Sequence, residues 1–311
     1  MDKPGILKIW LAQVRAPFLI LAVLLVMIGL ALSYKLPGEE IDFNILHAVL
    51  LVIGVVSAHT AVNLFNEYSD FKTRIDFHTI RNPFSGGSGM MIEGHTSPKS
   101  VKGAAISALI LAFGIGVYFT FVSHWIIFIL VLIGGLTIVF YTEGLARIML
   151  GELFAGLTLG SLVVVGTYIA MTSNPQKELG ELLSTVVVMV SIPPGILTSL
   201  LLLINEFPDV EADKAGGRLH LVIKLGKRKA AIIYNIGIAL TFAILLIIPI
   251  IQLAAFWIYI ALIPFPLGLK ACTTLMRHRE DNQKIIPALG TNVITVLATD
   301  LLIAVSVLIS I

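Results

Sequence analysis

Residues 183–209 read LSTVVVMVSIPPGILTSLLLLINEFPD, and this stretch decides the class of fold. Its first part, up to Asn205, carries no Asp, Glu, Lys or Arg. It is long enough to cross the hydrocarbon core of a bilayer, which takes ~20 residues as a helix. Glu206, Pro208 and Asp209 come directly after it. The stretch therefore predicts a membrane-spanning helix that ends in acidic side chains at one membrane surface.

The composition of the whole chain agrees with this prediction. Of 311 residues, 57% are hydrophobic and only 13% are charged, with a mean hydropathy of +0.97. A soluble domain carries about 25% charged residues, so we expect an all-α, multi-pass protein of the cell membrane. The single cysteine, Cys272, excludes a disulfide framework, a zinc site of several thiolates and a Cys-ligated iron–sulfur cluster. A net charge of +2 without a basic surface indicates no nucleic-acid partner, and no obligate protein partner is evident.

Apolar stretches separated by short polar breaks predict nine membrane-spanning helices in a single transmembrane domain over residues 1–311. The predicted spans are 15–33, 44–67, 101–122, 124–141, 151–172, 183–205, 229–250, 253–270 and 289–311. With a cytoplasmic N-terminus, 19 of the 21 Lys and Arg residues fall on the cytoplasmic side, all except Lys35 and Lys177. Because basic residues accumulate in cytoplasmic loops, we predict a cytoplasmic N-terminus and an external C-terminus.

Two longer loops, at about 68–100 and 206–228, follow the second and sixth spans on the predicted cytoplasmic side. They and the helix ends entering them hold eight of the 19 acidic residues. Each begins with an Asn-Glu-aromatic-x-Asp pentapeptide, at 66–70 and at 205–209. Two such pentapeptides at the ends of parallel helices predict two related halves, about 1–141 and 142–311.

The spacing within the two clusters suits a metal ion. Asn66 and Asp70 stand four residues apart, so they share one face of a helix, and Asp209 and Asp213 do the same if a new turn starts at Pro208. Carboxylate oxygens beside substrate phosphates are typical of Mg²⁺ sites. The same loops supply bases for a phosphate group, namely Lys72, Arg74, Arg81, Lys214 and Arg218. The alternative is that the acids only pair with neighbouring bases in charged loops.

At these residues the sequence resembles the UbiA superfamily of intramembrane prenyltransferases. The first motif of that family is Asn-Asp-x-x-Asp with a further Asp downstream, and its second is Asp-x-x-x-Asp after the sixth helix. The matching residues here are Asn66, Asp70 and Asp76, with Glu67 in place of the Asp, and then Asp209 and Asp213. Further matches are Arg15-x-Pro17, Tyr141-Thr142, Gly151-Glu152-Leu153 and Gly217-Arg218, which look most like the branch that prenylates 1,4-dihydroxy-2-naphthoate in menaquinone synthesis. His220 departs from the pattern, since a Thr is usual there.

The resemblance implies helices around a central cavity that opens to lipid, with the two motif loops over its cytoplasmic end. It implies two Mg²⁺ ions bridged by a prenyl diphosphate, an allylic carbocation and an aromatic acceptor. The expected metal ligands are Asn66, Asp70, Asp76, Asp209 and Asp213. The expected catalytic groups are Asp70, Asp209, Asp213 and Tyr141. The expected diphosphate-binding residues are Arg81 and Arg218, followed by Arg74, Arg147, Lys72 and Lys214.

Other functions stay open from the sequence. The acceptor is 1,4-dihydroxy-2-naphthoate, 4-hydroxybenzoate, a haem or chlorophyll precursor, or a glycerol ether phosphate as in archaeal-type lipids. A different class is a cation-coupled transporter, which would use Asp300 near the middle of the last span and the helix break at Pro193-Pro194-Gly195. The eight clustered acids at one predicted membrane face favour the enzyme.

Overall fold

The computed structural model describes residues 5–36, 43–251 and 255–310, and every regular element within them is helical. The long helices are α2 (Leu19–Lys35), α3 (Ile45–Lys72), α5 (Pro98–Val122), α6 (Ile126–Phe140), α8 (Leu162–Thr172), α9 (Thr185–Asn205), α12 (Lys227–Ile250), α13 (Phe265–His278) and α14 (Ile286–Ile309). The short helices are α1 (Ile6–Gln13), α4 (Ile75–His78), α7 (Gly151–Phe154), α10 (Val210–Ala215) and α11 (Leu221–Leu225). A π-helical segment, Ala155–Ser161, joins α7 to α8, and a 3-10 segment, Phe256–Leu262, precedes α13.

Of the nine predicted spans, eight correspond to helices long and apolar enough to cross a membrane in the described ranges. The remaining one, predicted at 124–141, is the apolar helix α6, which has only 15 residues. At 1.5 Å per residue α6 is about 22 Å long, shorter than the ~30 Å hydrocarbon core. Eight of the nine predicted spans therefore correspond to helices of membrane-spanning length in the described ranges. The helix at the remaining span, α6, is shorter.

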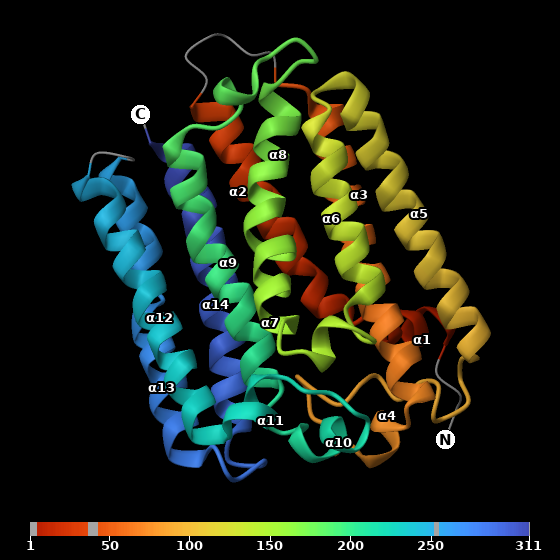
Figure 1. The fold of residues 1–311 in the computed structure, drawn as a ribbon. Helices are drawn as coiled ribbons and strands as arrows, with labels where there is room; N and C mark the ends of the chain where they lie inside the picture. The colour runs from red at the N-terminus through yellow and green to blue at the C-terminus, as the bar shows by residue number, and fades with distance from the viewer. Residues whose placement is uncertain (1–4, 37–42, 252–254, 311) are drawn as a thin grey trace.

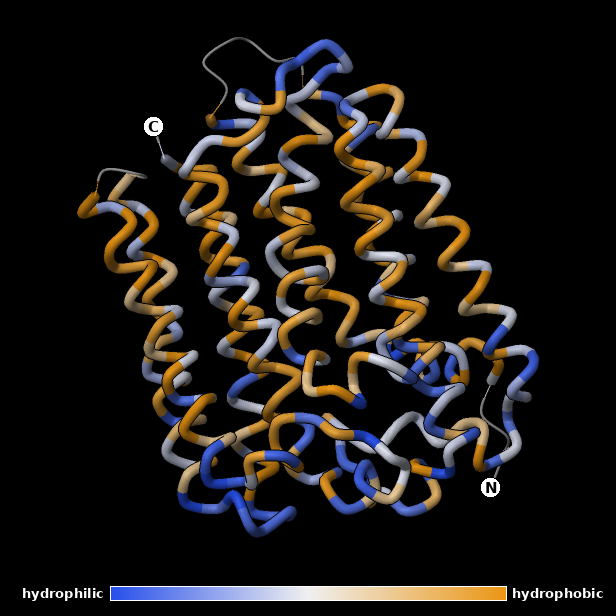
Figure 2. Tube along the Cα trace, in the orientation of Figure 1, coloured by the Kyte–Doolittle hydropathy of each residue, from blue (hydrophilic) through white to orange (hydrophobic). Residues whose placement is uncertain are grey.

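The long helices run side by side and alternate in direction (Figure 1). Helices α3, α6, α9 and α13 run toward the end of the bundle that carries α4, α10 and α11, and their neighbours run the other way. We call this end the motif end, because both acidic pentapeptides lie there. Helix α1 also lies at the motif end, whereas α14 finishes at the opposite end. Figure 2 shows hydrophilic residues gathered in the loops of the motif end, below helices that are mostly hydrophobic.

Close packing between α9 and the π-helical segment forms the centre of the bundle. A Cβ on Gly160 would lie 2.5 Å from the Cα of Gly195, so only glycine permits this approach. Gly195 follows Pro193 and Pro194, which lie inside α9. The Oγ of Ser161 donates to the Ser191 carbonyl at 2.9 Å, across the same contact. The Gly156-x-x-x-Gly160 pattern is thus a helix-packing device, as is usual in membrane proteins.

The outer surface of the helices is apolar. Ile110 and Phe121 of α5 are 66% and 76% exposed, while Leu25 of α2 and Leu197 of α9 are fully buried. Such an exposed apolar surface is stable only in contact with lipid or another apolar partner. The bundle is therefore a multi-pass membrane protein.

Candidate active site

A cavity of about 400 Å³ extends from the motif end into the bundle between α2, α3, α5, α6, α8 and α9. Most of its wall is apolar, including Leu51, Val55, Leu109, Phe113, Val131 and Leu159. Its polar wall lies at the motif end and includes Asn66, Asp70, Asp76, Tyr141, Asp209, Asp213 and Arg218. The cavity therefore combines a charged end with a long apolar body, which suits a ligand with a charged head and a hydrocarbon chain.

The first acidic motif comes from the end of α3 and the short helix α4. Asn66 and Asp70 lie one turn apart on α3, and both line the cavity as their spacing predicts. Arg74 adopts a left-handed backbone conformation with φ of 64°. The chain changes direction there, between the end of α3 and the start of α4. This turn brings Asp76 back to the cavity, where it is buried.

The second motif follows α9 and has the predicted new turn after Pro208. Helix α10 begins at Val210 with Asp209 just before it, and the Asp213 amide donates to the Asp209 carbonyl at 2.9 Å. Asp209 and Asp213 both line the cavity. The two motifs, more than 130 residues apart in the chain, therefore face one cavity end.

Arg218 joins the two motifs. Its Nη1 donates to Asp213 Oδ1 at 3.0 Å and its Nη2 donates to Asn66 Oδ1 at 2.9 Å. The guanidinium also forms an ion pair with Asp70. Burial by itself would lower the pKa of Arg218, but the carboxylates of Asp70 and Asp213 outweigh burial and raise it above its ordinary value. The side chain stays charged in the cavity.

Two other carboxylates of the site form no ion pair with an arginine or lysine within the described ranges. Burial and then the carboxylates of Asp70 and Glu67 raise the pKa of Asp76 to about 8. Burial and then Asp213 raise the pKa of Asp209 to about 7, and its Oδ1 accepts a 3.3 Å hydrogen bond from Ser85 Oγ. Crowded oxygen ligands with too little positive charge are the donor set of a divalent cation site. The residues present therefore fit Mg²⁺.

The other predicted diphosphate-binding residues lie outside the cavity wall. Lys72, Arg74 and Lys214 are exposed at the motif end. Arg81 and Arg147 are also exposed, and each pairs with a glutamate: Arg81 Nη1 lies 2.8 Å from Glu93 Oε1, and Arg147 Nη2 lies 2.8 Å from Glu143 Oε2. Among the predicted bases, Arg218 alone lines the cavity in the described part of the chain. A role for the others stays a prediction.

Tyr141 lies where α6 ends and lines the cavity beside the acidic residues. Burial and then the carboxylate of Glu206 raise its pKa above the ordinary value. Its hydroxyl is therefore protonated and is available as a hydrogen-bond donor to an anion in the cavity.

Glu67 has a different role from its neighbours in the first pentapeptide. Its carboxylate accepts from Gln13 Nε2 at 2.8 Å and from the amide and hydroxyl of Ser88, each at 2.6 Å. It also lies 3.7 Å from the Nε of Arg15, a cavity residue whose φ of 54° is left-handed. The sequence reading missed this connection. The helical period was the available signal, since Glu67 is about 100° around α3 from Asn66.

The loop around residues 85–89 closes the motif end. Gly86 and Gly87 line the cavity, and both have positive φ, 89° and 69°. A Cβ on Gly87 would lie 2.6 Å from Asp76 Oδ1, so the loop backbone packs directly on a predicted metal ligand. Ser88 ties the loop to Glu67. This segment belongs to the loop at about 68–100, which the family resemblance implies lies over the end of the cavity.

Comparison with known proteins identifies the family of the chain. A family model described as the UbiA prenyltransferase family matches residues 22–288. The chain is 27% identical over 234 residues to the 1,4-dihydroxy-2-naphthoate octaprenyltransferase of Bacillus subtilis, covering 74% of this chain and 71% of that protein.

Solved structures share the fold. The apo structure of a UbiA homologue from Aeropyrum pernix K1 matches with a TM-score of 0.70 at 17% identity, covering 94% of this chain and 98% of the other. A UbiA homologue from Archaeoglobus fulgidus bound to DMAPP and Mg²⁺ matches with a TM-score of 0.58 at 13% identity, covering 95% and 99% of the two chains. The family match spans most of the bundle and contains both acidic motifs. The chain thus belongs to the UbiA prenyltransferase family and is a multi-pass membrane prenyltransferase.

Proposed function

We propose that this protein transfers an isoprenoid chain from a prenyl diphosphate to an aromatic acceptor of the naphthoate type, as in menaquinone synthesis. The observation that carries the proposal is the convergence of both acidic motifs and Arg218 on the polar end of one apolar cavity. A polyprenyl diphosphate has the matching shape, a charged head on a hydrocarbon chain. Its head belongs at the membrane interface and its chain in the bundle. The motif end then faces the cytoplasm.

The acidic residues would hold Mg²⁺ with the donor. Asp70, Asp209 and Asp213 are the central ligands we propose, with Asn66 and Asp76 beside them, and the two motifs suggest two ions. When bound, Mg²⁺ supplies positive charge that neutralises the departing diphosphate. The homologue from Archaeoglobus fulgidus, which is bound to Mg²⁺ and DMAPP, supports this cofactor.

The side chains of the protein supply the rest of the reaction. Arg218 and the Tyr141 hydroxyl donate hydrogen bonds to the diphosphate oxygens, which gain charge as the C1–O bond breaks. The electron pair of that bond leaves with the diphosphate, and C1 becomes an allylic cation. The apolar wall keeps water away from this cation. A ring carbon of the acceptor then bonds to C1, and the ring regains aromaticity by losing the group on that carbon, a proton or a carboxylate as CO₂.

Two alternatives to this function are a glycerol ether phosphate acceptor and a cation-coupled transporter. A glycerol ether phosphate acceptor remains the alternative within the same enzyme class, since its prenyl donor would fit the same cavity. A cation-coupled transporter predicts acidic residues near the middle of the bundle. The motif acids lie at one end instead, and Asp300, although fully buried on α14, is not among the cavity residues of the described ranges.

Prenyl transfer by purified variants tests the proposal. We expect Asp209→Asn to lower Mg²⁺-dependent transfer at least on the order of 100-fold, because even the outer partners of metal ligands are worth 10–100-fold. Glu211→Gln is the matched control, since Glu211 is exposed on the same helix α10. The readout is release of pyrophosphate from an allylic diphosphate that depends on the acceptor.

A panel of acceptors, including 1,4-dihydroxy-2-naphthoate, 4-hydroxybenzoate and a glycerol ether phosphate, identifies the substrate class. Near-normal transfer by Asp209→Asn would refute the metal cluster. Transfer to the glycerol ether phosphate alone would refute the aromatic acceptor and leave the enzyme class intact.

A further inference from the structure

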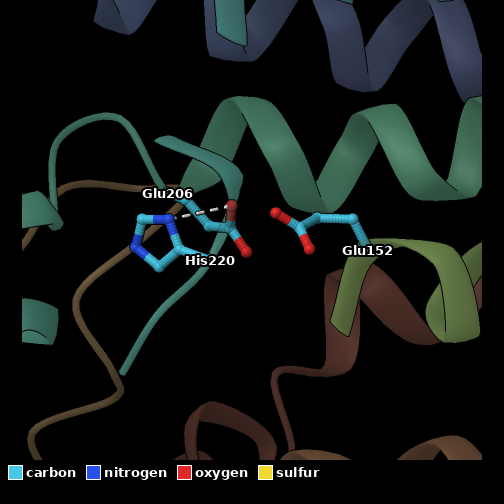
Figure 3. Close-up of side chains that lie close together, drawn as sticks. All are labelled: Glu152, Glu206 and His220. Atoms are coloured by element: carbon cyan, nitrogen blue, oxygen red, sulfur yellow. Dashed lines mark ion pairs between the residues drawn. The ribbon is translucent and has the colours of Figure 1, made fainter. Parts of the chain in front are cut away.

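A second cluster of polar side chains lies behind the acidic motifs and has no role in the reaction proposed above. Glu152 comes from α7, Glu206 follows α9, and His220 precedes α11 (Figure 3). Each is buried, with exposed fractions of 3%, 9% and 2%. One potential ligand atom from each lies within 4.8 Å of those of the other two. Three elements far apart in the chain thus direct ligand atoms to one point.

One oxygen of each carboxylate in this cluster lacks a hydrogen-bond donor in the described part of the chain. Glu152 Oε1 accepts a hydrogen bond from the Leu221 amide at 2.7 Å, but its Oε2 is buried and has no partner. Glu206 Oε2 also has no hydrogen-bond partner. Neither residue forms an ion pair with a lysine or arginine there. Figure 3 shows the Glu152 carboxylate directed toward Glu206. Two facing buried carboxylates repel each other unless a cation lies between them.

The orientation of His220 adds a third acceptor. Its Nε2 lies 3.3 Å from Asp213 Oδ2, and its Nδ1 accepts a long 3.4 Å hydrogen bond from the Ile223 amide. In the neutral ring, the proton is therefore on Nε2 and the lone pair is on Nδ1. Nδ1 lies 3.3 Å from Glu206 Oε2. An ion bound at Nδ1 would take over the lone pair that accepts this long bond from the Ile223 amide, and Nε2 faces the second motif.

A metal ion would neutralise these facing acceptor atoms more completely than a single proton would. One proton on Glu206 can be donated either to Glu152 or to Nδ1, so one repulsive contact would remain. A divalent ion contacts all three atoms and cancels the charge of the two carboxylates. The 3.3 Å separation of Nδ1 and Glu206 Oε2 equals the ligand spacing of a tetrahedral site with bonds of about 2.0–2.1 Å. A metal-bound histidine also typically has a carboxylate near its other ring nitrogen, and Asp213 Oδ2 lies 3.3 Å from Nε2.

We propose that Glu152, Glu206 and His220 bind a divalent transition-metal ion of the Zn²⁺ type, at a site separate from the Mg²⁺ ligands of the two motifs. The imidazole ligand favours Zn²⁺ or Co²⁺ over Mg²⁺. Glu206 and His220 also line the cavity, so the fourth position of the ion faces it. The ion would join α7, α9 and α11 and hold His220 against Asp213. Binding at this site does not depend on the identity of the acceptor.

The test uses Co²⁺ and Zn²⁺ on the full-length protein, purified without a polyhistidine tag and kept in excess Mg²⁺ to occupy the motif ligands. We expect about one Co²⁺ per chain with the intense visible absorption of a tetrahedral site, displaced by Zn²⁺. Glu152→Gln should lose this spectrum at unchanged helix content. His220→Thr should also lose it, and this variant carries the residue that is usual in the family. Asp70→Asn is the control and should keep the spectrum, because Asp70 belongs to the first motif.

Each outcome decides the proposal. No tetrahedral Co²⁺ in the unmodified protein, or equal binding by Glu152→Gln and His220→Thr, overturns it. Loss of the spectrum in Asp70→Asn alone would assign the ion to the motif site and also overturn it. Normal Co²⁺ binding by a protein with no prenyl transfer would leave this site standing while the proposed function fails.

Discussion

The carboxyl groups of Asp76 and Asp209 make the stability of the protein depend on pH and Mg²⁺. Without Mg²⁺, the pKa of Asp76 in the folded state, about 8, lies above its ordinary 3.8, and that of Asp209 is about 7. Folding therefore favours the protonated forms. Their contribution to the free energy of unfolding is fully present below about pH 4 and is lost as the pH rises through about 7–8.

Since Mg²⁺ binds the ionised carboxylates, we expect it to raise Tm more at about pH 8 than at about pH 5. Thermal unfolding in detergent, with and without Mg²⁺ across this range, measures the effect. Asp76→Asn should reduce the dependence, while Asp281→Asn should not, because Asp281 is a surface residue paired with Lys284 at 3.0 Å. The same shift in Tm at every pH would contradict the assignment of these carboxylates as ligands.

Single residues of the first pentapeptide divide between two tasks, and the helical period explains the division. Asn66 and Asp70 share the cavity face of α3. Glu67 points instead to Gln13, Arg15 and the loop at Ser88. Glu67, which replaces the usual Asp of the family, therefore fixes the loop that covers the other acids of the site.

At the scale of elements, the contact between α9 and the π-helical segment positions the second acidic motif relative to the rest of the site. Glu152 and Glu206 lie next to it, and Ser199 Oγ of α9 donates to the Glu152 carbonyl at 2.8 Å. The glycines at 156, 160 and 195 make the approach possible. A shift of α9 here would move the second motif relative to the first.

We expect Gly160→Ala to destabilise the protein by about 1–3 kcal/mol, the usual result of overpacking. The added methyl would lie 2.5 Å from the Gly195 Cα, and both sides of that contact are backbone. Gly114→Ala on α5 is the matched control, because its Cβ meets nothing within 4 Å. It should be neutral or stabilising by up to about 1 kcal/mol, as alanine favours helix over glycine. Thermal unfolding of both variants in detergent measures the difference, and equal effects would show that the helix contact is not tight.

The distribution of polar residues predicts how the whole molecule is oriented in the membrane. Hydrophilic residues gather in the loops of the motif end (Figure 2). In the sequence, all Lys and Arg residues except Lys35 and Lys177 fall in the loops and helix ends predicted for that side. By the positive-inside rule, we predict that the motif end faces the cytoplasm. The donor and acceptor would then reach the site from the cytoplasmic side.

Labelling of introduced cysteines tests this orientation. The single native cysteine, Cys272, is buried on α13, so it gives little background. Lys99→Cys lies at the motif end where α5 begins, and Glu178→Cys lies at the opposite end, both at exposed positions. We expect a membrane-impermeant thiol reagent to label Glu178→Cys in intact bacterial cells, and Lys99→Cys only after the cells are broken. The reverse pattern would invert the topology.

The sequence by itself determined the class of fold and the approximate positions of the long helices. Uncharged runs of membrane-spanning length must form helices in lipid, because the backbone has no other partner for its hydrogen bonds. The four-residue spacing of Asn66 and Asp70, and of Asp209 and Asp213, determined which side chains share a face.

Only the tertiary structure decided which charged groups meet. Arg218 reaches both motifs, whereas Arg81 and Arg147 lie outside the cavity wall beside Glu93 and Glu143. The meeting of Glu152, Glu206 and His220 likewise depends on how three helices pack. Periodicity fixes directions within one helix, but contacts between helices depend on close packing, as at Gly160 and Gly195, that local sequence does not encode.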